Sequence, residues 1–300
     1  MGSLTDLRPP APLGGLGSPR WLRRLGVASL VMNIVIILTG GLVRLTDSGL
    51  GCPTWPQCTP GSYTPHQALG IHGVIEFGNR TLTFVLIVIA LITWIATLLY
   101  RRPDGTPDRK LRWLTFGMGF GIPFQGVIGG ITVHTGLNPY VVALHMLNSM
   151  VLVALSAWLV RLTWPAPRRT VSGPARALSA VIFALSWLVV CLGTVVTGSG
   201  PHAGDVNAHR TGLDPVVISH LHATAVYALV AATVLLVIML RGHRPALLLL
   251  AVEIAQGIIG FVQYFNGLPI GVVELHLLGA AGTIACASNL FCSLRGPHRG

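Results

Sequence analysis

Charged residues are scarce in this sequence, and acidic residues are the scarcest. Only 10% of its 300 residues are charged, and nine residues are Asp or Glu, whereas a soluble domain carries about 25% charged residues. The chain is also 52% hydrophobic. This balance excludes an ordinary soluble domain and indicates a protein surrounded by lipid.

Long segments without charge account for the composition. Six uncharged segments are near or above the roughly 20 residues that a helix needs to span a bilayer. They are Leu25–Val43, Thr81–Tyr100, Trp113–Val133, Tyr140–Val160, Ala177–Pro201 and Val216–Leu240. Two more, Pro245–Pro269 and Ile270–Leu294, carry one acid each. Because backbone polar groups that face lipid must be satisfied within a helix or a closed barrel, the sequence predicts an all-α integral membrane protein with eight transmembrane helices.

The basic residues follow an alternating pattern that predicts the topology. The net charge of +11 is concentrated in every second connection. These clusters are Arg20 to Arg24, Arg101 to Arg112, Arg161 to Arg176, Arg241 to Arg244, and Arg295 to Arg299. The positive-inside rule places such connections, and with them both termini, in the cytoplasm. Since topology explains the charge, we expect no nucleic-acid partner.

The N-terminal segment is unlike the rest of the chain. Residues 1–24 are rich in Pro and Gly, and we predict a disordered cytoplasmic tail there. A full-length apolar span follows, in place of a short apolar region with a cleavage site. We therefore expect no cleaved signal peptide.

Cysteine is also scarce, with five residues in the chain. Cys52 and Cys58 share the first exterior loop, where an oxidising environment favours a disulfide. Metal or redox chemistry is the alternative for such a closely spaced pair. Cys191, Cys286 and Cys292 fall in or at the ends of spans, where we expect small buried apolar residues.

An internal repeat defines the domain organisation. The segment Gln125–Gly129 recurs as Gln256–Gly260, and Leu144-His145 recurs as Leu275-His276. Both matches have the same offset of 131 residues, from 125 to 256 and from 145 to 276. Four spans separate the copies, which gives them the same orientation in the membrane. This is a parallel repeat, related by an axis along the membrane normal.

The earlier spans match more loosely, with Gly40–Val43 similar to Gly193–Val196. We expect two pseudo-symmetric four-helix bundles. The N-terminal half covers residues 25–160 and the C-terminal half residues 177–294, and a cytoplasmic linker, residues 161–176, joins them.

Histidines mark the exterior ends of several spans. His145, His222 and His276 begin spans four, six and eight, and ionisable groups inside spans indicate functional sites. His222 and His276 lie at similar depth in one half, where two neutral imidazoles are a common way to hold a heme iron. A structural histidine is the alternative at each position. His220 points to a different face of the helix and competes weakly with His222.

Polar residues also cluster at the start of span two. Glu76, Asn79 and Arg80 share one helical face because they are three and four residues apart. A plain ion pair between Glu76 and Arg80 is one interpretation. The functional interpretation makes Glu76 a proton acceptor or charge stabiliser beside a substrate. Arg44 and Arg80, at the same level, would meet heme propionates.

These residues carry a family resemblance. The run from Gly40 to Cys58 resembles the first span and cysteine loop of heme A synthases, and Ile75–Arg80 and the repeated Gln-Gly segments extend the likeness over about residues 25–290. The resemblance implies an oxidoreductase that converts the C8 methyl of heme O to a formyl group by successive hydroxylations. It also implies a multi-pass protein of the bacterial cell membrane. The preference for Arg over Lys suggests an actinobacterial-like form.

The resemblance also implies roles for single residues. The C-terminal half would bind heme b through the iron ligands His222 and His276. The N-terminal half would bind the substrate heme O, with His145 as iron ligand and Glu76 as the essential acid. The pair of Cys52 and Cys58 is tied to enzyme function in the family. Membrane lipid, heme O synthase and cytochrome c oxidase assembly are the implied partners.

One position departs from the family. The usual pattern in span two is Glu-x-x-His-Arg, and this chain has Asn79 at the histidine. His145 then remains as the one sure ligand of the substrate heme, with His72 as a weaker substitute. The sequence assigns no role to Glu253, His202 or His209, and it names no electron acceptor and no oligomeric state.

Two other functions fit parts of the pattern. A b-type membrane cytochrome would transfer electrons from quinol without modifying heme, and it would need the histidines but not Glu76. A transporter or heme-delivery protein is less well supported, because the repeat is parallel and the sequence indicates no broken helices.

Overall fold

The computed structural model describes residues 15–164 and 171–295. Within these ranges the chain is helical, and the predicted eight spans are confirmed: eight helices are long and apolar enough to cross a membrane. They are α1 (Pro19–Leu45), α2 (Gly70–Leu99), α3 (Arg109–His134), α4 (Pro139–Thr163), α5 (Gly173–Ser199), α6 (Pro215–Leu240), α7 (Arg244–Phe265) and α8 (Ile270–Ser293). A short 3₁₀ turn, Gln67–Leu69, precedes α2.

Local capping sets two boundaries that differ from the prediction. The expected disordered tail, residues 1–24, is helical from Pro19, because Ser18 caps the backbone NH of Trp21 and proline fits the first turn. Residues 1–14 of this tail lie outside the described residues. The expected linker, residues 161–176, is also shorter: α4 runs to Thr163 and α5 begins at Gly173 after the Ser172 cap. Residues 165–170 lie outside the described part.

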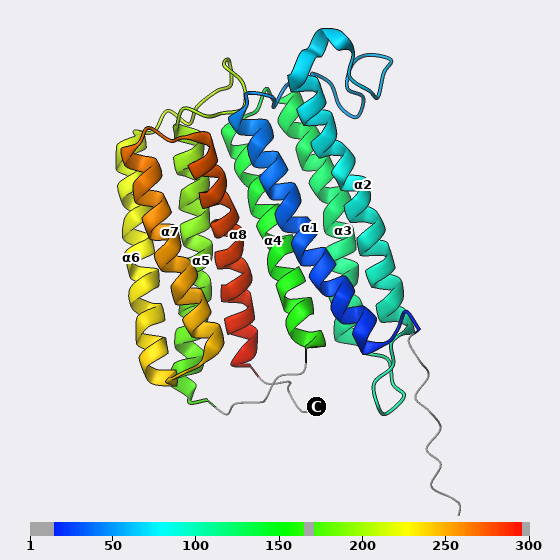
Figure 1. The fold of residues 1–300 in the computed structure, drawn as a ribbon, viewed down its shortest axis with the longest axis vertical. Helices are drawn as coiled ribbons and strands as arrows, with labels where there is room; N and C mark the ends of the chain where they lie inside the picture. The colour runs from blue at the N-terminus through cyan, green and yellow to red at the C-terminus, as the bar shows by residue number, and fades with distance from the viewer. Residues whose placement is uncertain (1–14, 165–170, 296–300) are drawn as a thin grey trace, which may run out of the picture.

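The helices form two groups of four (Figure 1). Helices α1–α4 contact one another in the order α2, α1, α4, α3, and α5–α8 form an equivalent group. The seam between the groups consists of α1, α4, α5 and α8. Residues 46–66, here called the cysteine loop, lie at one end of the bundle together with the α3–α4, α5–α6 and α7–α8 connections (Figure 1). That this end faces the exterior stays a prediction.

Buried positions recur at a constant offset between equivalent helices. The offset is 153 residues from α1 to α5 (190 minus 37) and 143 residues from α2 to α6 (229 minus 86). The α1–α5 pairs are Leu22 and Ala175, Gly26 and Ser179, Ser29 and Ile182, Asn33 and Ser186, and Ile37 and Val190. The α2–α6 pairs are Leu86 and Leu229, Ala90 and Thr233, Thr93 and Leu236, and Thr97 and Leu240. The burial pattern therefore extends the repeat to helices in which sequence identity is weak.

The turns after α3 and α7 repeat as well. The NH of Leu137 donates to the carbonyl of Thr132 at 2.8 Å, and the NH of Leu268 donates to Gln263 at 2.9 Å. Both leucines have φ of 59°, and each follows a glycine with positive φ. Such left-handed turns satisfy the last carbonyls of a helix. α4 and α8 each begin two residues after the leucine, so His145 and His276 are both the seventh residue of their helix.

Candidate functional site

The rings of three histidines lie against glycines of neighbouring helices. A Cβ built on each of these glycines would lie 3.1–3.5 Å from the histidine Cε1. The pairs are Gly129 of α3 with His145 of α4, Gly193 of α5 with His222 of α6, and Gly260 of α7 with His276 of α8. At Gly129 this distance, 3.1 Å, is shorter than an ordinary contact, whereas at Gly193 and Gly260 a Cβ would be in ordinary van der Waals contact with the ring. The three rings thus have equivalent settings.

Their ring nitrogens are arranged for ligation. Nδ1 of His222 lies 3.0 Å from the carbonyl oxygen of Val189, so Nδ1–H donates and Nε2 carries the free lone pair. Nδ1 of His145 and of His276 are buried and have no hydrogen-bond partner among the described residues. His222 of α6 and His276 of α8 belong to the same group of four helices. The two histidines predicted to share one iron thus lie in the same half, and their joint ligation stays a prediction.

This arrangement suits a heme better than a bare metal ion. In residues 15–164 and 171–295 no group of three or more His, Cys, Asp or Glu side chains could hold a metal ion. A porphyrin supplies four nitrogens itself and needs one or two protein ligands. Imidazole rings held against the helix backbone at the ends of apolar spans fit that need. The predicted ligation of iron by His145, His222 and His276 stays a prediction.

Glu76 is buried, with 6% of its surface exposed. Its Oε1 accepts hydrogen bonds from Nε and Nη2 of Arg80, and its Oε2 accepts from the backbone NH of Cys52 at 2.7 Å. The ion pair that the sequence left as an alternative is therefore present. The contact with the cysteine loop was not foreseen.

Arg80 is bound to the cysteine loop as well. It donates from Nη1 to the carbonyl of Thr54 at 3.0 Å and from Nη2 to that of Cys52 at 3.0 Å. Together Glu76 and Arg80 bind one NH and several carbonyls of the loop. The acid of span two is thus held against the segment that contains the two cysteines.

The cysteine loop covers the end of the N-terminal half. Sγ of Cys52 and Sγ of Cys58 are bonded, and both residues are fully buried. The Trp55 ring lies against Gly130, where a Cβ would collide with it, and Nε2 of His134 is 3.2 Å from the Trp55 carbonyl oxygen. Gly130 is next to Gly129, on which the His145 ring lies. The loop therefore contacts α3 at the residue next to the one on which the His145 ring lies.

We expect Cys52 and Cys58 to resist alkylation until a reductant is added, because a disulfide leaves no thiolate to react. The measurement is mass spectrometry of the loop peptide after labelling in denaturant, where burial gives no protection. Cys191, Cys286 and Cys292 have free thiols and are half-buried, so they serve as the internal control and should label without reductant. Labelling of both loop cysteines without reductant would contradict the disulfide and favour the metal or redox alternative.

Arg44 lies at the seam between the halves. Its Nη2 donates to the carbonyl of Thr197 in α5 at 2.7 Å. The NH of Gly49 also donates to the Gly204 carbonyl at 2.8 Å. Arg44 therefore joins the two halves at the cysteine-loop end of the bundle.

The other histidines named from the sequence either have hydrogen-bond partners or are exposed. Nε2 of His202 is 3.2 Å from the Leu268 carbonyl oxygen, and His209 is exposed. Nδ1 of His72 is 2.9 Å from Oγ of Ser48 at the start of α2. His220 is exposed and His222 is not. The expectation that these two neighbours occupy different faces is confirmed.

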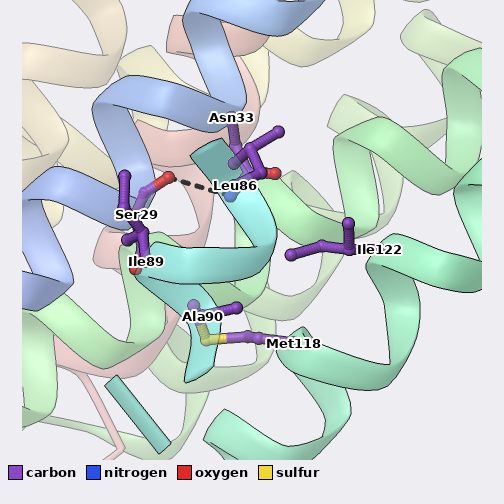
Figure 2. Close-up of a pocket in the computed structure, with 7 residues that line it drawn as sticks. All are labelled: Ser29, Asn33, Leu86, Ile89, Ala90, Met118 and Ile122. Carbon is purple, nitrogen blue, oxygen red and sulfur yellow. Dashed lines mark hydrogen bonds between the residues drawn. The ribbon is translucent and has the colours of Figure 1, made fainter. Parts of the chain in front are cut away.

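A small cavity in the N-terminal half can be compared with the surroundings of Glu253 in the C-terminal half. The cavity, of about 10 Å³, lies between α1, α2 and α3 beside Asn33, Ala90 and Ile122 (Figure 2). It has room for one water and is far too small for a porphyrin. In the C-terminal half the positions of Ala90 and Ile122 are occupied by Thr233 and Glu253, which are hydrogen-bonded at 2.9 Å. Glu253 and Thr233 thus hold positions at which the other half has two apolar side chains beside a cavity.

Several bacterial proteins are similar in sequence to parts of this chain. The heme A synthase of Shewanella oneidensis is 29% identical over 59% of this chain and 55% of that protein. The heme A synthase of Lysinibacillus sphaericus is 35% identical over 44% and 41%, and that of Symbiobacterium thermophilum is 32% identical over 41% and 39%. The matches thus span about half of these relatives or less.

The pattern of a family described as cytochrome oxidase assembly protein (COX15-CtaA) matches residues 23–288. This match runs from the first turns of α1 almost to the end of α8 and includes all three histidines and Glu76. With eight helices able to span a membrane and bacterial relatives, the protein is a multi-pass bacterial membrane protein. The resemblance seen in the sequence is confirmed: the chain belongs to the cytochrome oxidase assembly protein family COX15-CtaA.

Proposed function

We propose that this protein is a heme A synthase, which oxidises the C8 methyl group of heme O to a formyl group by successive hydroxylations. The observation that carries the proposal is the difference between two otherwise equivalent halves. The C-terminal half has His222 of α6 and His276 of α8 against glycines of neighbouring helices, whereas the N-terminal half has only His145 in such a setting and carries the Glu76–Arg80 ion pair on α2. The names of the relatives agree with this function.

The C-terminal half would hold the cofactor. His222 and His276 would ligate heme b, and the hydrogen bond from His222 to the Val189 carbonyl would fix its ring with Nε2 towards the iron. Heme b, when bound, supplies one-electron chemistry. A pair of imidazole ligands suits electron transfer because it leaves no position open for substrate.

The N-terminal half would hold heme O. His145 would ligate its iron, and Arg44 and Arg80 supply positive charge for propionates at the same end of the bundle. Oxidation of a methyl group removes protons and electrons from carbon. Glu76 would accept a proton or stabilise positive charge there, and its contacts with Arg80 and the Cys52 NH hold the carboxylate in place.

A b-type cytochrome that carries electrons from quinol is the second candidate, because His222 and His276 alone would suffice for it. Such a protein would need neither the Glu76–Arg80 pair nor the loop bound to it. We also propose heme O synthase as the partner that supplies the substrate, and cytochrome c oxidase assembly as the process that uses the product.

Expression with a heme O synthase in a host that makes no heme A tests the function. We expect heme A in the extracted pigments, and heme b bound to the purified protein. Chromatography of the acid-extracted hemes measures both. Heme b alone, with heme O unchanged in the membranes, would support the cytochrome and contradict the synthase.

A further inference from the structure

The repeat gives each heme-facing histidine an equivalent position in the other half. His145 and His276 correspond to one another at the offset of 131 residues. At the α2–α6 offset of 143 residues, His222 corresponds to Asn79. At the α1–α5 offset of 153 residues, its glycine partner Gly193 corresponds to Gly40. The site in the N-terminal half therefore has Gly40 and Asn79 where the other half has Gly193 and His222.

The surroundings of Gly40 differ from those of its three counterparts. A Cβ built on Gly129, Gly193 or Gly260 would meet an imidazole ring, but nothing lies within 4 Å of a Cβ built on Gly40. The cradle for a fourth ring is present in α1, and the ring is missing. The space remains unfilled by side chains of the described residues.

Asn79 does not take over the role of a histidine. Its Oδ1 accepts a hydrogen bond from Oγ1 of Thr39 at 2.6 Å, which turns the amide towards α1. Amide groups are also poor ligands for a heme iron compared with imidazole. The side chain thus borders the space without closing it.

The other candidates on α2 are occupied or too far away. His72, the single histidine of α2, is bound to Ser48, and it precedes Asn79 by seven residues, which is roughly 10 Å along the helix. Both carboxylate oxygens of Glu76 accept hydrogen bonds from Arg80 and the Cys52 NH. Neither residue reaches the position that His222 has in the other half.

We propose that the N-terminal half binds its heme through His145 alone, and that the opposite face, between Gly40 and Asn79, is an open site for a small exogenous ligand such as water or carbon monoxide. This inference rests on the proposed function only in that each half holds a heme. The two halves then have different tasks: the closed bis-histidine site carries electrons, and the open site admits a small molecule beside Glu76.

The test is made on the purified full chain, loaded by co-expression with a heme O synthase. We expect a low-spin and a high-spin heme by electron paramagnetic resonance, and one carbon monoxide bound per chain after reduction. Asn79→His should convert the high-spin heme to low-spin and weaken carbon monoxide binding by at least about tenfold, since imidazole would occupy the sixth position. Its matched control, His222→Asn, should create a second site that binds carbon monoxide.

A second pair of variants tests the proposal without relying on Asn79→His alone. Gly40→Ala should fold and leave the low-spin signal unchanged, because its Cβ meets open space, whereas Gly129→Ala should perturb the high-spin signal, because its Cβ would lie 3.1 Å from Cε1 of His145. A fully low-spin wild type that binds no carbon monoxide would overturn the proposal, as would Asn79→His with unchanged binding. Carbon monoxide binding as expected, without heme A production, would instead contradict the proposed function and leave the open site standing.

Discussion

Glu76→Gln is expected to lower the conversion of heme O to heme A by about 100-fold or more, which is a usual effect of removing a proton acceptor or a preorganised charge. The physical reason lies in the hydrogen bonds of the two carboxylate oxygens of Glu76. One accepts from Arg80 and the other from the Cys52 NH. Glutamine keeps the size, but it loses the charge and must turn an NH₂ group towards one of these donors.

The measurement is chromatography of extracted hemes, together with the absorption spectrum of the purified protein. We expect heme O or a hydroxylated intermediate to accumulate while the low-spin heme b of the C-terminal half remains. Ser219→Ala is the matched control, because Ser219 holds the equivalent position in α6 and, within residues 15–164 and 171–295, its side chain bonds only to the Pro215 carbonyl. It should leave conversion unchanged.

The cysteine loop separates a catalytic effect from a structural one. If Glu76 serves only to anchor the loop, Glu76→Gln should expose Cys52 and Cys58 to reduction and lower the yield of folded protein. Normal heme A production by a well-folded Glu76→Gln protein would refute the catalytic role. Loss of expression together with loss of all heme would favour the structural role.

His276→Ala and His222→Ala are each expected to abolish the low-spin heme b spectrum. Removal of one axial imidazole leaves the iron with a single protein ligand, which changes its spin state and weakens binding. His222 has its Nδ1 bound to the Val189 carbonyl, and its loss also removes the group that fixes the ring. Absorption and electron paramagnetic resonance spectra of the purified variants measure the effect.

His220→Ala is the control for this pair. It lies two residues before His222 on the exposed face of α6, so the low-spin spectrum should persist. A complete low-spin spectrum in His276→Ala would show that this residue is not a ligand. In that case the unpartnered Nδ1 of His276 would need another explanation.

Much of the fold was predictable because the bilayer restricts the choices. Apolar length decides which segments span, and the eight predicted segments all lie within or overlap observed helices. Where the prediction differed, at Pro19 and Gly173, a serine cap extended the helix beyond the apolar run. Capping is a local interaction of a few residues, to which composition over a long window is insensitive.

The histidines were predictable for a related reason. An ionisable group at the end of an otherwise apolar span stands out from its neighbours, and the repeat showed that His145 and His276 are equivalent. The repeat in α1 and α2 was harder to see. There the two halves share burial more than identity, as in Asn33 and Ser186 or Thr97 and Leu240.

The partners of Glu76 could not be read from the chain. The sequence placed Arg80 one turn away on the same face, but the Cys52 NH is 24 positions earlier, and only the folded loop brings it to the carboxylate. The same holds for Trp55 against Gly130 and for Arg44 against Thr197. Contacts between distant segments depend on how the loop folds and on how the halves pack.

The sequence by itself determined the class of the protein, its eight spans, the repeat and the identity of the polar residues at the ends of the spans, because burying charge in lipid is costly and periodic apolar runs leave few alternatives. Only the tertiary structure decided which of these polar groups meet. It placed three imidazoles on glycines and left the fourth glycine, Gly40, facing open space. Packing between helices is set by side-chain shape at each contact, and that information is not local in the chain.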